Sequence, residues 1–445
     1  MRLPARLQLQ SAPARGVAIA GGLMAAALIV PAAFQWHVHA NGFAPLSAQW
    51  RPRVGPGTLP AVVLGVAAVR WFPRLADVLS WPRLLVVTFA AGVAWMTSLA
   101  AVDGWRGIGA ILDDQDEYLP TARRVTDVSA TLHQFVGRIS ADSTHPWPTH
   151  VAGHPPGALL FFVVLVAVGL GSGLAAGWTI VLIAATTPLA VLLTLRRLGA
   201  ERSARRVAPI LAVGPAAIWQ AVSADAMFGA LAAWGLCCLA CSATARSTAR
   251  LAGWSVAAGL LLGYCVLLSY GLVLLAVLGV AVVAAARNAR PLVGAGVASL
   301  AVVLAFAAAG FSWWQALPVL HDRYYAGIAS MRPAAYWLWG DLAAVCFCAG
   351  PVVGASIALA WRGRRGVRTD VEARPLVLLT LATVVSVLLA DVSLMSKAET
   401  ERIWLPFVPW LLLGVALLPP SWRRPALVSQ VVLGVALQSL LFTRW

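Results

Sequence analysis

The chain has 445 residues, of which 60% are hydrophobic and only 11% are charged. Soluble domains carry about 25% charged residues, so this composition excludes an ordinary soluble enzyme, a disordered chain and a secreted disulfide scaffold. The 33 basic and 17 acidic side chains give a formal charge of +16. Because the basic residues form short clusters between apolar segments, this charge is typical of the positive-inside rule, and we expect no nucleic-acid partner.

From the N-terminus onward, the predicted elements are apolar segments that recur to the end of the chain. A membrane-spanning helix needs about 20 apolar residues, so the pattern predicts an all-α polytopic membrane protein. Basic residues precede the first segment as in a signal peptide, but further spans follow, which indicates a retained first helix. The fourteen candidate segments lie at residues 16–34, 58–70, 84–102, 156–170, 175–195, 207–222, 226–243, 251–268, 271–286, 292–312, 335–358, 375–391, 403–418 and 426–443.

The segment at residues 156–170 decides the predicted topology. If it crossed the membrane with the other thirteen, the large arginine clusters that follow it would be extracytoplasmic, which contradicts the positive-inside rule. It has only fifteen residues and begins in a Pro-Pro step, so we predict a half-length helix there and about thirteen spans in total. Roughly two thirds of the basic residues are then cytoplasmic. The segments predicted to be extracytoplasmic are 103–155, the turn at Asp225, 313–334 and 392–402.

The loop at residues 103–155 is the longest stretch without membrane character. It contains Asp113-Asp114-Gln115-Asp116-Glu117-Tyr118 and ends in His154-Pro155-Pro156-Gly157. Four carboxylates within five residues repel one another, so the cluster is either a solvated acidic loop or is organised by a cation, a base function or a hydroxyl partner.

Three further polar sites interrupt apolar sequence on the same predicted side. They are Asp225, the stretch 321–325 with Arg323, and the stretch 397–402 with Lys397, Glu401 and Arg402. Each has a structural explanation, namely a helix N-cap, an aromatic belt and an interfacial ion pair. Their convergence on one side favours a functional explanation, because ionisable groups at membrane depth are candidates for function by default.

The order of these motifs resembles the GT-C superfamily of membrane glycosyltransferases. Within it, the branch of protein O-mannosyltransferases and lipid A aminoarabinose transferases is the most similar. The stretch from Asp114 through Tyr118 to Arg123 is similar to that branch's Asp-x-x-x-Tyr-x-x-x-Ala-Arg element, and His154-Pro155-Pro156-Gly157 resembles its His/Lys-Pro-Pro-Leu element. Ser223-Ala224-Asp225 resembles the second, supporting aspartate.

This resemblance implies a division of the chain into three regions. Residues 1–83 form N-terminal membrane helices, residues 84–245 form a GT-C-like catalytic core with the external loop 103–155, and residues 246–445 form C-terminal membrane helices. Unlike many relatives, the sequence ends directly after an apolar segment, so no soluble C-terminal domain is expected.

The resemblance also implies the roles of the candidate residues. Asp114 takes the place of the general base that removes a proton from the acceptor hydroxyl, with Asp113 and Asp116 as alternates under a shifted register. Neighbouring carboxylates, including Glu117, would raise its pKa by repulsion. The expected substrate-binding residues, which would stabilise the lipid phosphate or contact the sugar, are Tyr118, Arg123, His154, Arg323, Lys397, Glu401 and Arg402.

No cofactor is predicted with certainty. Some relatives place a metal-binding glutamate just before the His-Pro-Pro element, but this chain has Gly153 there, so a divalent metal is not supported. The six cysteines all lie inside apolar segments and are interpreted as small buried hydrophobic residues rather than zinc ligands.

The implied partners are a polyprenyl-phosphate sugar donor, a glycan, lipid or protein acceptor of the cell envelope, and membrane lipid. Two other classes remain open. Thirteen spans with Gly and Pro interruptions also fit a transporter or lipid flippase, although such proteins concentrate ionisable residues at the midplane of broken helices. A non-catalytic assembly factor of envelope synthesis is the third interpretation, and it would tolerate loss of Asp114.

Overall fold

A computed structural model describes residues 5–40 and 42–443 and is almost entirely helical. Arg2, which belongs to the predicted N-terminal basic cluster, and the side chain of Arg6 lie outside the described part of the chain. The longer helices are α1 (Ala5–Ala33), α2 (Thr58–Val78), α3 (Trp81–Ala100), α12 (Ala224–Ala243), α13 (Thr248–Val266), α15 (Pro291–Ala308), α17 (Ala334–Ala349), α19 (Ala373–Val392) and α22 (Pro420–Leu440).

Shorter helices connect or interrupt the longer ones. They are α4 (Tyr118–Ala122), α5 (Val128–Gln134), α6 (Thr149–Gly153), α7 (Pro156–Ala167), α8 (Gly173–Ala184), α9 (Thr187–Arg197), α10 (Glu201–Ala212), α11 (Ala217–Gln220), α14 (Leu275–Ala286), α16 (Trp313–Ala326), α18 (Val352–Gly363), α20 (Thr400–Ile403) and α21 (Val408–Leu411). Two short strands, β1 (Ala48–Trp50) and β2 (Leu441–Thr443), pair antiparallel with Ala48 opposite Thr443.

The helices agree with a polytopic membrane protein. Among the described residues, eight helical segments are long and apolar enough to cross a membrane, or nine if the bent pair α17–α18 counts as one span. The predicted count of thirteen is therefore not confirmed. The predicted spans that do not meet the same test of length and hydropathy lie at residues 207–222, 271–286, 403–418 and 426–443.

Proline and glycine explain most of these interruptions. The helix α10 ends at Ala212, just before Gly214-Pro215, and α17 meets α18 at Gly350-Pro351 with a bend of 101°. Proline removes a backbone donor and clashes with the preceding turn, and the positive φ of +76° at Gly350 suits a residue without a side chain. The segment 403–418 contains Pro406 and Pro409 and forms only single turns, which the surrounding protein buries almost completely.

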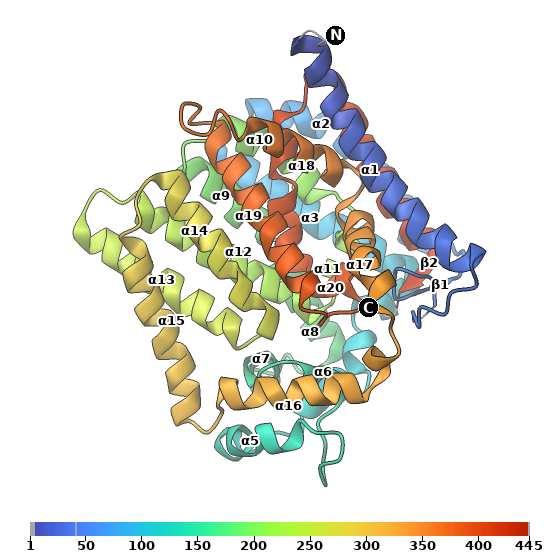
Figure 1. Ribbon diagram of the computed structural model, residues 1–445, viewed down its shortest axis with the longest axis vertical. Helices are drawn as coiled ribbons and strands as arrows, with labels where there is room; N and C mark the ends of the chain where they lie inside the picture. The colour runs from blue at the N-terminus through green and yellow to red at the C-terminus, as the bar shows by residue number, and fades with distance from the viewer. Residues whose placement is uncertain (1–4, 41, 444–445) are drawn as a thin grey trace.

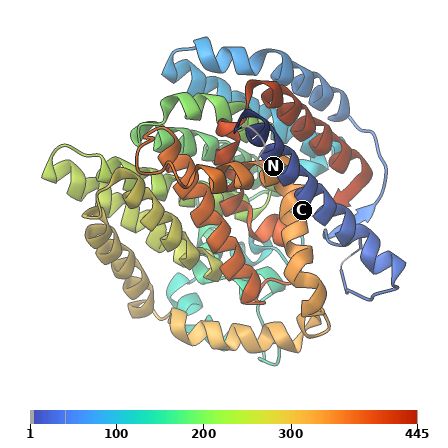
Figure 2. The ribbon, with the colours of Figure 1, turned by 45° about the horizontal axis from the view of Figure 1, so that its top comes forward.

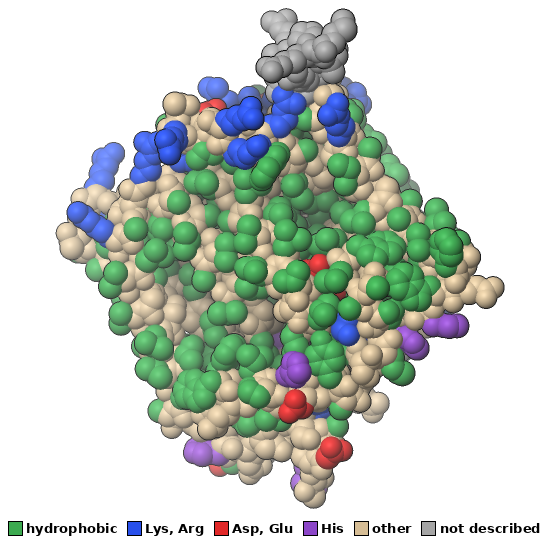
Figure 3. Space-filling view, in the orientation of Figure 1, with side chains coloured by type: hydrophobic (Ala, Val, Ile, Leu, Met, Phe, Trp, Pro, Cys, Tyr) green, Lys and Arg blue, Asp and Glu red, His purple; other side chains and the backbone are tan. Residues whose placement is uncertain are grey.

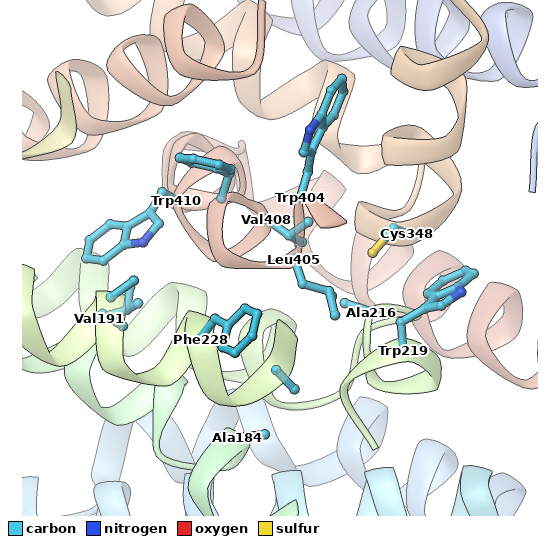
Figure 4. Close-up of a cluster of buried hydrophobic side chains, with 14 of the residues drawn as sticks. Ala184, Val191, Ala216, Trp219, Phe228, Cys348, Trp404, Leu405, Val408 and Trp410 are labelled. Carbon is cyan, nitrogen blue, oxygen red and sulfur yellow. The ribbon is translucent and has the colours of Figure 1, made fainter. Parts of the chain in front are cut away.

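The core of the protein surrounds α12. Of the candidate spans, α12 is the most enclosed, with 83% of its apolar window buried, whereas the corresponding value for α15 is 11%. Leu405 of the broken segment extends toward the side of Phe228 and α12 (Figure 4), and Trp404 and Trp410 of the same segment are also buried. The broken segment therefore lies inside the protein, where its non-helical backbone is sheltered from lipid.

The short helix after the Pro-Pro step has the predicted form. Pro155 precedes α7, and α7 spans the twelve residues Pro156–Ala167, too few to cross a bilayer of about 30 Å at 1.5 Å per residue. Gly157 packs closely here, because a Cβ at this position would lie 2.5 Å from the backbone oxygen of Leu267. This contact accounts for glycine at a position where the resemblance leads us to expect leucine.

The arginine clusters gather at one end of the molecule, which we call the basic end (Figure 3). The loops that carry them touch one another. The backbone N–H of Ser203 donates to Glu372 over 2.7 Å, and Arg287 donates to the backbone oxygen of Arg368 over 2.6 Å. The three arginine clusters that follow the segment at 156–170, at residues 196–206, 287–290 and 362–374, therefore lie at one end of the molecule.

The segments predicted to be extracytoplasmic also lie together, at the opposite end. Arg323 of α16 donates to backbone oxygens of Ile139 and Trp147 in the long loop. Tyr325 of the same helix donates to the backbone oxygen of Leu394. Figure 1 places α5, α6 and α16 together at this end, far from α10 at the basic end.

The N-terminal and C-terminal regions pack on each other rather than forming separate bodies. The helix α1 lies against α18 so closely that a Cβ at Gly16 would be 2.2 Å from the backbone oxygen of Gly354. Arg53 pairs with Asp103 over 2.6 Å and also donates to the backbone oxygen of Leu441. Contacts thus cross the predicted boundaries between the three regions.

We expect the two ends of the molecule to face opposite sides of the membrane. Ser421 at the basic end and Ser129 in the long loop are both exposed and suit cysteine substitution. We expect Ser129→Cys to be labelled in intact cells and Ser421→Cys to be labelled only after permeabilisation, because arginine-rich loops remain cytoplasmic. Equal labelling of both positions in intact cells would refute this topology.

Candidate functional site

A group of charged and aromatic side chains is buried where the long loop, α12 and α20 meet. We call Glu117, His150, His154, Asp225 and Arg402 the buried cluster. Glu117, Asp225 and Arg402 are at most 5% exposed. The five residues come from four separate stretches of sequence, so their meeting depends on tertiary structure alone.

The ion pair between Asp225 and Arg402 joins two of the four stretches that form the buried cluster. Asp225 lies in the first turn of α12, where a carboxylate also interacts favourably with the helix dipole. Its Oδ2 accepts a hydrogen bond from Nη1 of Arg402 over 2.9 Å, and both side chains are at most 4% exposed. Ser223 takes the N-cap position instead, so the N-cap explanation of Asp225 is wrong.

Carboxylates surround Arg402 on more than one side. Its Nη2 lies 3.4 Å from Oε2 of Glu399, and Glu399 in turn lies 4.0 Å from the guanidinium of Arg332. Burial opposes the charge of Arg402, but Asp225, Glu399 and Glu117 together raise its pKa above the ordinary value. Arg402 therefore stays charged although it is buried.

Glu117 and His150 form a carboxylate–imidazole pair at the edge of the cluster. Oε1 of Glu117 lies 2.8 Å from Nδ1 of His150. Burial by itself would raise the pKa of Glu117, but the His150 imidazole, with Arg402 and His154, holds that pKa below its ordinary value. Both side chains are largely buried, with exposed fractions of 12% for His150 and 7% for Glu117.

Aromatic rings fix the orientation of His154. Its Nδ1 donates to the backbone oxygen of His150 over 3.0 Å, which leaves Nε2 as the acceptor in the neutral ring. Tyr118 and Phe228 flank the imidazole at ring distances of 5.8 Å and 5.7 Å, and Phe162 stacks on Tyr118. Burial lowers the pKa of His154, although the negative charge of Asp225 acts to raise it. The ring is therefore neutral near pH 7.

The other carboxylates of the acidic stretch lie at the surface. Asp113, Asp114 and Asp116 are all exposed. Asp113 pairs with Arg123 over 2.6 Å, Asp114 accepts from the backbone N–H of Asp116, and Asp116 accepts from the Thr149 hydroxyl. Of the four predicted acidic residues in this stretch, only Glu117 lies in the buried cluster.

Two of the predicted phosphate-binding cations bond to backbone instead. Lys397 is buried, and its Nζ donates to the backbone oxygens of Ala329 and Arg332 over 2.7 Å and 3.1 Å. Arg323 bonds to two backbone oxygens of the long loop, as described above. Both side chains hold loops together, and Arg402 is the predicted cation that lies in the buried cluster.

Glu401 points away from Arg402. It is fully buried, and its Oε1 accepts the backbone N–H of Ser47 over 2.8 Å, while Oε2 has no hydrogen-bond partner among the described residues. Burial raises the pKa of Glu401 to about 7. The predicted interfacial pairing of Arg402 is thus made with Glu399, in a buried setting.

The sequence named Glu399 as a possible partner of Arg402, but it did not identify His150 and Arg332 as members of this group. His150 lies on the short helix α6, and His154 is the C-cap residue of that helix, where its Nδ1 bonds to the backbone oxygen of His150. The spacing of four residues between the two histidines could have indicated this contact. Arg332 carried no such signal, because Glu399 and Arg402 are distant from it in sequence.

Comparison with protein-family models, curated proteins and solved structures found no match. Within residues 5–40 and 42–443, no three His, Cys, Asp or Glu side chains are grouped so that they could hold a metal ion.

The raised pKa of Glu401 predicts how stability changes with pH. The folded protein binds this proton more tightly than the unfolded chain does. The contribution of Glu401 to the free energy of unfolding is therefore fully present below pH 4.5 and is lost as pH rises through about 7. Glu401→Gln mimics the protonated form. It should raise thermal stability at pH 8, by about 3 kcal/mol at most, and change it little at pH 5.

Asp142→Asn is a suitable control for this measurement, because Asp142 is exposed. Thermal unfolding of the purified protein in detergent at the two pH values gives the comparison. An equal effect of Glu401→Gln at both values would mean that Glu401 is ionised throughout.

Breaking the central ion pair should destabilise the protein strongly. Removing one partner of a buried pair leaves an uncompensated charge, which costs about 3–5 kcal/mol. We expect Arg402→Met and Asp225→Asn each to lower the unfolding temperature, and the double variant to recover part of the loss. Arg196→Met, which breaks a half-exposed pair with Glu201, is the matched control and should cost about 0–1 kcal/mol. Additive losses in the double variant would contradict a direct interaction.

Proposed function

We propose that this protein is an integral membrane glycosyltransferase that moves a sugar from a polyprenyl-phosphate donor to a hydroxyl of a cell-envelope acceptor. One observation carries the proposal. The long loop, the His-Pro-Pro step, the aspartate of α12 and the arginine of α20 meet in one buried cluster (Glu117, His150, His154, Asp225 and Arg402). The GT-C resemblance implies that the first three of these stretches belong to one functional site.

Glu117 is the general base in this proposal. It takes the proton from the acceptor hydroxyl as the oxygen forms a bond to the anomeric carbon of the sugar. The lowered pKa keeps the carboxylate ionised and ready to accept. His150, 2.8 Å away, positions the Glu117 carboxylate. Glu117 replaces Asp114 in this role because Asp114 lies on the exposed side of the loop.

Arg402 stabilises the leaving phosphate. As the bond between the anomeric carbon and the phosphate oxygen breaks, the electron pair remains on that oxygen and adds negative charge. A guanidinium that stays charged in a buried site suits the oxygens of a phosphate. His154, with an acceptor at Nε2, is suited to a hydroxyl of the sugar rather than to the phosphate.

A cavity in the long loop provides room for the acceptor. It has a volume of about 290 Å³, and its lining includes Thr121 and Pro148, neighbours of the buried cluster along the chain. Arg138 lies 3.4 Å above the ring of Trp147 at this cavity. Polar groups beside an aromatic ring suit a sugar-bearing or hydroxyl-bearing acceptor, such as an envelope glycan, lipid or protein.

The orientation of the site follows from the charge distribution. Because the arginine clusters gather at the basic end, the positive-inside rule puts the buried cluster on the extracytoplasmic face, where a lipid-linked donor replaces nucleotide sugars. A topology of thirteen spans follows if the segments 207–222, 271–286, 403–418 and 426–443 also cross in shortened or broken form.

A transporter or flippase is the second candidate. The bend of 101° between α17 and α18 is a broken helix, and Asp341 on α17 is only 2% exposed. Asp391 near the end of α19 is also buried. Ionisable groups on broken helices are typical of transport sites. This candidate would be favoured if the Asp341→Asn variant lost transport while the Glu117→Gln variant retained it.

The glycosyltransferase proposal predicts a specific effect of changing Glu117. In cells that lack the protein, the polyprenyl-phosphate sugar should accumulate, and mass spectrometry of lipid extracts measures it. The parent sequence should clear the accumulated lipid, whereas Glu117→Gln should leave it, since losing a general base reduces rate by about 10²–10⁴. Asp114→Asn is the matched control and should clear the lipid.

Two results would change this assignment. Clearance by Glu117→Gln with failure of Asp114→Asn would return the base to the aspartate that the sequence resemblance indicates. If no lipid-linked sugar accumulates even when the protein is missing, the glycosyltransferase proposal is refuted.

A further inference from the structure

A large polar cavity opens at the basic end, away from the buried cluster. Its volume is about 570 Å³. It lies where the end of α2, the start of α10, the segment before α19 and the start of α22 meet. Its lining consists of Asp77, Gly199, Glu201, Arg202, Arg205, Arg206, Glu372 and Arg423.

Two of the three carboxylates in this cavity already have partners. Glu201 accepts hydrogen bonds from both Arg196 and Arg205, over 2.9 Å and 3.0 Å. Glu372 accepts the backbone N–H of Ser203 over 2.7 Å. Asp77 is left to balance the remaining arginines, so the cavity has an excess of positive charge.

Among the described residues, Arg202, Arg206 and Arg423 line the cavity without a carboxylate partner within hydrogen-bond distance, and Arg206 and Arg423 are the two that neighbour each other. Arg423 donates from Nε to the backbone oxygen of Leu418 over 3.2 Å. Burial and the neighbouring Arg206 guanidinium lower the pKa of Arg423, against the attraction of Asp77. Two like charges held side by side at a cavity are stabilised when an anion lies between them.

Exposed apolar side chains lie on two of the helices that reach the cavity. The helices α2 and α22 lie side by side (Figure 2). On α2, Leu75 and Val78 near the cavity are 37% and 77% exposed, and on α22, Val428 and Val432 are 39% and 59% exposed. A ligand with an anionic head and apolar chains would therefore meet complementary surface along its whole length.

We propose that this cavity binds the phosphodiester headgroup of an anionic phospholipid, whose acyl chains lie along α2 and α22. Basic pockets between membrane helices at the cytoplasmic surface are suited to such headgroups. Arg206 and Arg423 contact the phosphate, and the exposed valines contact the chains. This site is separate from the buried cluster and does not depend on the proposed glycosyl transfer.

Lipid binding by the purified full-length protein tests the proposal. Native mass spectrometry compares short-chain phosphatidylglycerol, phosphatidylcholine of the same chain length and inorganic pyrophosphate. We expect phosphatidylglycerol to bind in preference to phosphatidylcholine. Each of Arg206→Gln and Arg423→Gln should weaken phosphatidylglycerol binding about fivefold. Arg424→Gln is the control, because Arg424 is exposed and outside the cavity lining.

A further variant separates the lipid from a soluble anion. Val78→Ser should weaken phosphatidylglycerol binding and leave pyrophosphate binding unchanged, and the exposure of Val78 makes a folding defect unexpected. Pyrophosphate that binds as tightly as the lipid and is insensitive to Val78→Ser would reassign the cavity to a soluble phosphate and overturn the proposal. Equal losses in Arg424→Gln and Arg206→Gln would overturn it as well, because they would indicate a diffuse basic surface.

Discussion

The buried ion pair between Asp225 and Arg402 is the interaction on which the candidate site depends. It joins the first turn of the most enclosed helix, α12, to the short turn α20, and each partner would be costly to bury alone. Arg402 stays charged, and Glu117 also remains ionised because the His150 imidazole, together with Arg402 and His154, holds its pKa below the ordinary value. The pair of Asp225 and Arg402 thus holds α12 and the turn before the broken segment together.

The broken segment around residues 403–418 makes this arrangement possible. A continuous helix through Pro406 and Pro409 would carry its polar N-terminal turn to the membrane surface. The single turns instead place Trp404 and Trp410 in the protein core and keep Arg402 beside α12. Irregular backbone at such a depth is tolerated when protein rather than lipid surrounds it.

The two ends of the molecule differ in where their charged side chains lie and in what they contact. At the basic end, arginines are numerous, and some face an open cavity with few available carboxylates. At the opposite end, Asp113, Asp114 and Asp116 are exposed, but other charged groups are buried in pairs, as Asp225 and Arg402 are, or bonded to backbone, as Lys397 and Arg323 are. The first arrangement favours reversible contact with an anionic ligand, and the second favours a fixed constellation of groups around a reacting substrate.

The sequence by itself determined the features that depend on local composition. Hydropathy predicted an all-helical membrane protein, the Pro-Pro step predicted the short α7, and the spacing of arginines predicted which loops share an end. Tertiary structure alone decided which member of the acidic stretch is buried. Glu117 lies only three residues after Asp114, and the turn between them buries one carboxylate against His150 and leaves the other exposed to solvent. The partners that distinguish these positions are distant in sequence, so neither composition nor periodicity could identify them.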